Sequence, residues 1–256
     1  MMRAASSGGG EDMTATFDLR LGRWQDALAD VECDALICDP PFGARTHAAW
    51  RPDHRTSVML ERTAIVYESW MPEDVSAFVA HWSPRTSGWM VALTSHDLAP
   101  AWQAAYEACG RYAFAPLPCV TWGGSIRLAG DGPSSWTVWA MVARPKTRRY
   151  QSWGTLPGAY QVAGCLSDKL SNRGGGRGKP LDLMKAIVRD YSRPGDLICD
   201  PTAGLATTGV AALTMGRRFV GSECDPDTFE KARKRLAETQ VVDLFDPGRA
   251  KQEVLL

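Results

Sequence analysis

The 256-residue chain lacks several features that mark whole classes of protein. It has no apolar run long enough to span a membrane, and its N-terminus has no basic segment followed by an apolar stretch, as a signal peptide would. Its seven cysteines include no C-x-x-C pair, and its four histidines do not cluster with them, which argues against a zinc site. We therefore expect a reduced, cytoplasmic protein with buried thiols, no metal and no membrane partner.

The chain also lacks an excess of charge of one sign, because 29 Lys and Arg residues balance 29 Asp and Glu residues. Proteins that bind nucleic acid are often basic, so any such contact must come from a local concentration of charge. The segment 144–178 is rich in basic residues. Two interpretations stay open for it: a solvated linker, or a small insert that follows a phosphate backbone. The candidate nucleic-acid-binding residues in it are Arg144, Lys146, Arg148, Arg149, Arg173 and Arg177.

Short apolar runs alternate with amphipathic segments along most of the chain. The continuous apolar runs at 35–38, 89–94 and 196–199 are typical of buried parallel strands. Helical spacing is strongest at 72–83, 99–109, 181–191, 206–215 and 227–236. This alternation predicts an α/β fold with a doubly wound, mostly parallel sheet. We expect one domain, residues 14–256, after a disordered Gly- and Ser-rich tail at 1–13.

The first candidate site is Asp39-Pro40-Pro41-Phe42, directly after the apolar run 35–38. Ligands in open parallel sheets bind at the carboxyl ends of the strands. A carboxylate there can accept an N–H from an amine on a base, while prolines present carbonyl oxygens from a stiff turn without donating an N–H. Phe42 offers a flat face for stacking a base. On its own the string is a weak signal, since Asp-Pro pairs also simply end strands.

The second candidate site is Asp200-Pro201-Thr202-Ala203-Gly204, which lies between a buried strand and a helix. A glycine turn at a helix N-terminus favours an anionic group such as a carboxylate. Glu223 follows about twenty residues later, the offset at which an acid commonly holds a ribose diol. This spacing fits an adenosyl cofactor. It would also fit a nicotinamide dinucleotide, but the turn has no G-x-G-x-x-G sequence.

Together the two sites resemble the DNA amino-methyltransferases (N6-adenine and N4-cytosine enzymes) in their circularly permuted, "beta" motif order. Three stretches carry the resemblance: DALICDPPFG at 34–43, GKPLDLMKAIVRDYSRPGDLICDPTAG at 178–204, and GRRFVGSECDPDTFEKARKRL at 216–236. The chain departs from the family pattern at Leu205 and Ala206, where a serine and a glycine are usual. Early in the chain it has Gly22-Arg23 in place of the usual Gly-Asp.

The resemblance implies a Rossmann-like methyltransferase fold that binds S-adenosylmethionine and methylates DNA, with double-stranded DNA as the favoured partner. It assigns the target base to Asp39, Pro40, Pro41 and Phe42. It assigns the cofactor to Asp200, Thr202, Ala203, Gly204, Glu223 and Lys179, with Lys179 near its carboxylate. The aspartate before the two prolines favours adenine over cytosine. The segment 144–178 would be the target-recognition insert, and a homodimer could extend it.

From this assignment we expect that a base is flipped out of the duplex and that its amine attacks the sulfonium methyl group directly. Such an enzyme would act in a bacterial cell or a phage-infected host, in restriction, phage protection or regulation. Two alternatives stay open. One is methylation of an RNA base or of a guanine or cytosine amine, because the same turn suits any aromatic exocyclic amine. The other is a catalytically weak nucleic-acid-binding protein that keeps the fold, an idea motivated by Leu205 and Arg23.

Overall fold

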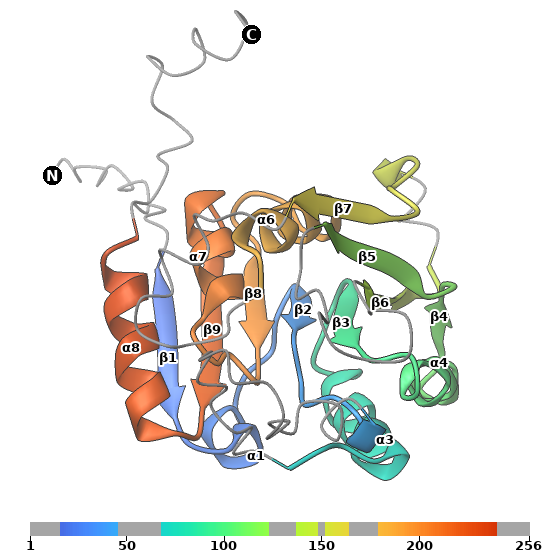
Figure 1. The fold of residues 1–256 in the computed structure, drawn as a ribbon, viewed down its shortest axis with the longest axis horizontal. Helices are drawn as coiled ribbons and strands as arrows, with labels where there is room; N and C mark the ends of the chain where they lie inside the picture. Colours follow the sequence, from blue (N-terminus) through green and yellow to red (C-terminus); the bar gives the residue numbers. More distant parts are fainter. Residues whose placement is uncertain (1–15, 46–67, 123–136, 148–151, 164–178, 240–256) are drawn as a thin grey trace, which may run out of the picture.

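The computed structural model describes residues 16–45, 68–122, 137–147, 152–163 and 179–239. Within these residues one mixed sheet runs in the order β1-β9-β8-β2-β3-β6-β5-β7, and β4 pairs with β6 (Figure 1). The strands are β1 (Phe17–Leu21), β2 (Ala35–Cys38), β3 (Met90–Thr94), β4 (Arg111–Ala113), β5 (Leu117–Trp122), β6 (Thr137–Pro145), β7 (Tyr160–Ala163), β8 (Leu197–Asp200) and β9 (Arg218–Glu223).

Five neighbouring strands, β1, β9, β8, β2 and β3, are parallel, so their carboxyl ends lie at one edge of the sheet. Strand β6 runs antiparallel to β3 and to β5, and β7 runs parallel to β5. The predicted doubly wound, mostly parallel sheet is therefore confirmed.

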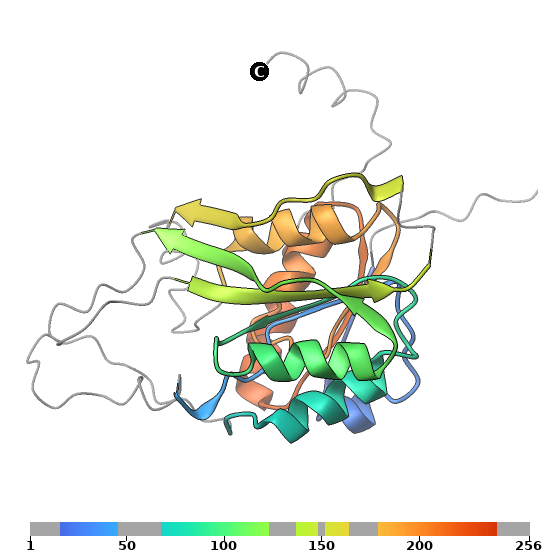
Figure 2. The same cartoon turned by 90° about the vertical axis from the view of Figure 1, so that its right-hand side faces the viewer.

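Helices cover both faces of the sheet (Figures 1 and 2). One layer holds α6 (Leu181–Tyr191), α7 (Thr207–Thr214) and α8 (Pro226–Ala237), and the other holds α1 (Trp24–Ala27), α3 (Pro72–Trp82) and α4 (Ala99–Ala108). None of the described helices is long and apolar enough to cross a membrane.

The central strands are apolar at every position because they bury both faces. In β2, Ala35 and Ile37 pack toward the α6–α8 layer, whereas Leu36 and Cys38 pack toward the α3–α4 layer. Successive side chains of a strand point to opposite faces, so a strand between two helix layers needs a continuous apolar run. This is the pattern that the sequence shows at 35–38.

The segment 144–178 is less separate from the sheet than the sequence predicts. Its described parts include the end of β6 and the whole of β7, which extends the sheet by pairing with β5. Strand β7 and the short β4 were not predicted. Whether the segment recognises a target stays a prediction, and the tail at 1–13 lies outside the described residues.

Candidate active site

Two of the predicted turns come together at the centre of the sheet. Asp200 is the last residue of β8, and Asp39 directly follows the neighbouring parallel strand β2. From β8 the chain continues through α7 to β9 on one side, and from β2 through α3 to β3 on the other. The β8–β2 boundary is thus the point at which the winding of the sheet reverses, where open α/β sheets form their ligand crevice.

The carboxylate of Asp39 pairs with Lys179, which lies just before α6. Lys179 Nζ is 2.8 Å from Asp39 Oδ1, and the side chains of Lys179 and Asp39 are 22% and 30% exposed, respectively. The same Nζ lies over the ring of Phe42, 4.4 Å from its centroid. Lys179 is thus in contact with both ends of the Asp39–Phe42 turn. The sequence predicted a cofactor contact for this lysine and gave no signal for this pairing.

The residues that follow β3 support the same turn. The N–H of Gly43 donates to Ser95 Oγ at 3.2 Å. The Asp97 carboxylate packs so closely against Gly43 that a Cβ at position 43 would collide with it. Sequence reasoning missed Ser95 and Asp97, although both lie within three residues after a predicted parallel strand and so belong to the edge where sites form.

The Asp200 turn is held by its own backbone and by β9. Asp200 Oδ1 accepts the N–H of Thr202 at 3.1 Å, and the N–H of Ala203 donates to the carbonyl of Ser222 at 2.9 Å. Gly204 and Ala206 both have left-handed backbone angles, with φ of 53° and 54°. The structure therefore shows that the chain keeps a left-handed residue at 206 although it has lost the usual glycine there.

Burial raises the pKa of Asp200 to about 7, because the buried carboxyl loses the hydration that its charged form needs. Hydrogen bonds from Thr208 and from the Thr202 N–H lower the pKa, while the charges of Asp39 and Glu223 raise it further. The mutual effect of these carboxylates shows that the ends of β2, β8 and β9 share one electrostatic environment. Glu223 also accepts the N–H of Asp225 on Oε1, at 2.8 Å.

The described part of the predicted nucleic-acid-binding set lies away from this site. Arg144 belongs to β6, and its neighbour Ala143 pairs with Met90, the first residue of β3. Arg144 and the exposed Lys146 are therefore at the edge opposite to Asp39. The Arg144 guanidinium lies 4.9 Å from the centroid of the Tyr112 ring. Arg148, Arg149, Arg173 and Arg177 lie outside the described residues.

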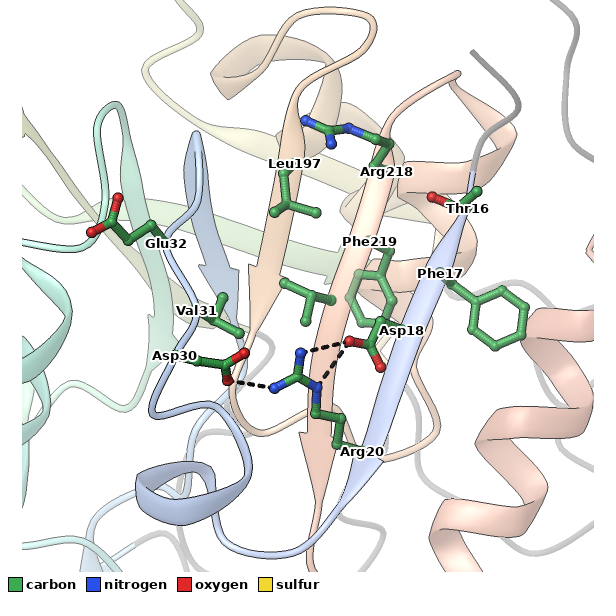
Figure 3. A pocket seen from close by; sticks show the side chains of 11 residues that line it. Thr16, Phe17, Asp18, Arg20, Asp30, Val31, Glu32, Leu197, Arg218 and Phe219 are labelled. Carbon is green, nitrogen blue, oxygen red and sulfur yellow. Dashed lines mark hydrogen bonds and ion pairs between the residues drawn. The ribbon is translucent and has the colours of Figure 1, made fainter. Parts of the chain in front are cut away.

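A cavity of about 310 Å³ lies elsewhere, beside β1 and the first residues of β8 and β9 (Figure 3). Arg20 at its wall pairs with Asp18 at 2.8 Å and with Asp30 at 2.6 Å. Its cation is thus already neutralised by carboxylates of the same wall. The cavity includes none of the predicted site residues, so it adds nothing to the site between β2 and β8.

The mostly parallel sheet with helices on both faces is a Rossmann-like fold, as in solved DNA methyltransferases. Among solved structures, the chain resembles the M1.HpyAVI–SAM complex with a TM-score of 0.62 and 21% identity, covering 86% of this chain and 99% of that one. Residues 136–234 match the family model described as DNA methylase, N6_N4_Mtase. This match covers less than half of the chain and agrees with the resemblance that the motifs carry.

Two curated relatives match over shorter stretches. The DNA adenine methyltransferase YhdJ of Escherichia coli K12 is 41% identical over 58 residues, which are 23% of this chain and 20% of that protein. The type II methyltransferase M2.DpnII of Streptococcus pneumoniae is 33% identical over 108 residues, 39% of this chain and 40% of that protein. The matches thus span two fifths or less of the length of these relatives.

Proposed function

We propose that this protein transfers a methyl group from S-adenosylmethionine to the N6 amine of adenine in double-stranded DNA. One observation carries the proposal: the Asp39–Phe42 turn and the Asp200–Gly204 turn end neighbouring parallel strands at the point where the sheet reverses its winding. One turn has the groups that suit a base and its amine, and the other has those that suit an adenosyl cofactor.

The Asp200 turn fits the cofactor by its own chemistry. In the described part of the chain, the N–H groups of Gly204 and Leu205 have no hydrogen-bond partner, and no atom lies within 4 Å of the position that a Cβ at Gly204 would take. Free N–H donors before a helix suit a carboxylate. The buried Asp200 carboxyl suits an ammonium group, and the second oxygen of Glu223 suits a ribose hydroxyl. When bound, the cofactor would supply the electrophilic methyl group.

The Asp39 turn suits a flat base that carries an amine. The side chain of Asp39 is 30% exposed, so a ligand can reach it. Its carboxylate would accept one N–H of the amine, and the Pro40 carbonyl would accept the other. Phe42 would stack on the base. These contacts hold the nitrogen in position, and positioning of this kind supplies a large part of the rate in a direct transfer.

Adenine in DNA is favoured by two separate points. The residue before the two prolines is Asp39, as is usual in the adenine enzymes of the family, and one relative is named as a DNA adenine methyltransferase. Since the relatives are bacterial, we propose that the enzyme acts in the cytoplasm. Contact between DNA and the basic segment 144–178 stays a prediction.

Nucleoside analysis tests the proposal. The purified protein is incubated with S-adenosylmethionine carrying an isotope-labelled methyl group and with genomic DNA from a strain that lacks its own DNA methyltransferases. The DNA is then digested and analysed by mass spectrometry. We expect labelled N6-methyldeoxyadenosine. Labelled N4-methyldeoxycytidine would overturn the adenine assignment, and the absence of labelled nucleoside would overturn the activity itself.

A further inference from the structure

Lys179 contacts two of the residues that the proposed function assigns to the target base. The role inferred for this lysine rests on that proposed function. Its ammonium group pairs with the carboxylate of Asp39 at 2.8 Å and lies 4.4 Å from the centre of the Phe42 ring. These are the two side chains assigned to the target base. A protonated amine that forms an ion pair with a carboxylate while lying over an aromatic face contacts the same two groups as a stacked amine-bearing base would.

The ammonium of Lys179 and the amine of a base cannot both take the same oxygen of Asp39 while sharing the Phe42 ring. A base that enters the pocket must therefore displace the lysine. Displacement is feasible because the Lys179 side chain is 22% exposed and lysine has a flexible four-carbon stem. Both side chains of the pair are also partly exposed, and such ion pairs are weak enough to exchange for another donor.

We propose that Lys179 is a specificity-determining residue that occupies the target-amine position until a base with an exocyclic amine replaces it. Such a base gives Asp39 a new N–H donor in exchange for the ammonium. Thymine presents a carbonyl oxygen at the equivalent position. If thymine displaced Lys179, the Asp39 carboxylate would lose its cation and face a second hydrogen-bond acceptor. A polar group left without a partner is costly, and this cost selects against bases without the amine.

The proposal can be tested through the chemical reactivity of Lys179. The protein is treated with a limiting amount of an acetylating reagent, and acetylation of each lysine is measured by mass spectrometry. Three samples are compared: protein alone, protein with deoxyadenosine, and protein with thymidine. Nucleosides are chosen because they lack the phosphates that could shield a lysine. Lys231, exposed on α8, is the internal control.

We expect deoxyadenosine to raise the acetylation of Lys179 about two- to fivefold, the range expected for the loss of one partly exposed ion pair. Thymidine should have no such effect, and Lys231 should not respond to either nucleoside. In the Asp39→Asn variant, Lys179 should react at the raised rate without any nucleoside. Because this arm needs no ligand, it gives a result even if nucleosides bind weakly.

Equal reactivity of Lys179 in the wild type and in Asp39→Asn would overturn the proposal, as would an equal rise in Lys179 acetylation with the two nucleosides. A methylation assay on the same preparation separates this failure from failure of the proposed function. Methylated DNA together with unchanged Lys179 reactivity would reject the role of the lysine alone. An absence of methylated DNA would reject the activity, and with it the proposal.

Discussion

The Asp39 turn and the Asp200 turn begin with the same Asp-Pro pair at the ends of neighbouring strands, yet their surroundings differ. Asp39 is 30% exposed and pairs with Lys179. Asp200 is 2% exposed, has only neutral donors as hydrogen-bond partners, and feels the charges of Asp39 and Glu223. Burial, more than residue type, therefore separates an accessible carboxylate from one whose charge changes near neutral pH.

The largest effect is expected from removing the charge of the exposed carboxylate. Asp39→Asn should lower the rate of methyl transfer by about 10²–10⁴-fold, the range for losing a positioned proton acceptor. The fold should survive because asparagine has the same shape, and a partly exposed ion pair adds at most about 1 kcal/mol to stability. Single-turnover methyl transfer, with circular dichroism as the folding control, measures both. A rate near that of the wild type would remove Asp39 from the site.

A glycine-to-alanine substitution should lower the free energy of unfolding by different amounts beside the Asp39 turn and in the Asp200 turn. Gly43→Ala places a Cβ against the Asp97 carboxylate and should lower the free energy of unfolding by about 1–3 kcal/mol. In Gly204→Ala the new Cβ lies in open space. Only the left-handed backbone, with φ of 53°, then lowers the free energy of unfolding, by about 1 kcal/mol. Urea denaturation compares them. Adding Asp97→Ala should rescue Gly43→Ala and leave Gly204→Ala unchanged, and rescue of both or neither would contradict this account.

Stability should also depend on pH through the buried carboxyl. Since folding raises the pKa of Asp200 from 3.8 to about 7, the folded state binds more protons than the unfolded state between these values. The contribution of this group is therefore fully present below about pH 4 and is lost as the pH rises to about 7. Asp200→Asn should show a smaller loss of stability than the wild type between pH 5 and pH 8. Equal losses in urea titrations would show that Asp200 ionises normally.

The smallest effect is expected at Ala206, the one described residue other than glycine with a positive φ. A left-handed backbone costs an alanine about 1–2 kcal/mol, and glycine avoids this cost but loses more conformational entropy on folding. Ala206→Gly should therefore raise the free energy of unfolding by up to about 1 kcal/mol. Thermal unfolding measures the change, and a clear loss of stability would mean that the Ala206 methyl group packs better than its backbone suggests.

Much of the fold could be predicted because its signals are local. Helix 181–191 and strand 35–38 have the bounds that the sequence indicated, since the helix has a clear apolar period and the strand is a continuous apolar run. Strand β4 was missed because it begins with Arg111, a buried charge held by oxygen atoms of Ser83, Thr86 and Gly88. Strand β7 has only four residues, and its partner β5 lies about forty positions earlier.

The candidate site was predictable only in part. Its two turns carry recognisable motifs, and the motif order implied that they meet. The contact between Lys179 and Asp39 joins residues 140 positions apart in the sequence. It depends on β8 lying beside β2 and on the place where α6 begins, which no local pattern contains. No local pattern indicates Asp97 either, because its role in the site depends on its contact with Gly43, more than fifty positions earlier.

We propose that the two turns bind different ligands, the Asp39 turn the base and the Asp200 turn the cofactor. Calorimetric titration of S-adenosylmethionine into Asp39→Asn and Asp200→Asn tests it most directly. We predict wild-type affinity for Asp39→Asn and an affinity about 10–100-fold lower for Asp200→Asn, as expected for losing a charge-assisted hydrogen bond. Equal weakening in both variants, or weakening in Asp39→Asn alone, would contradict the account.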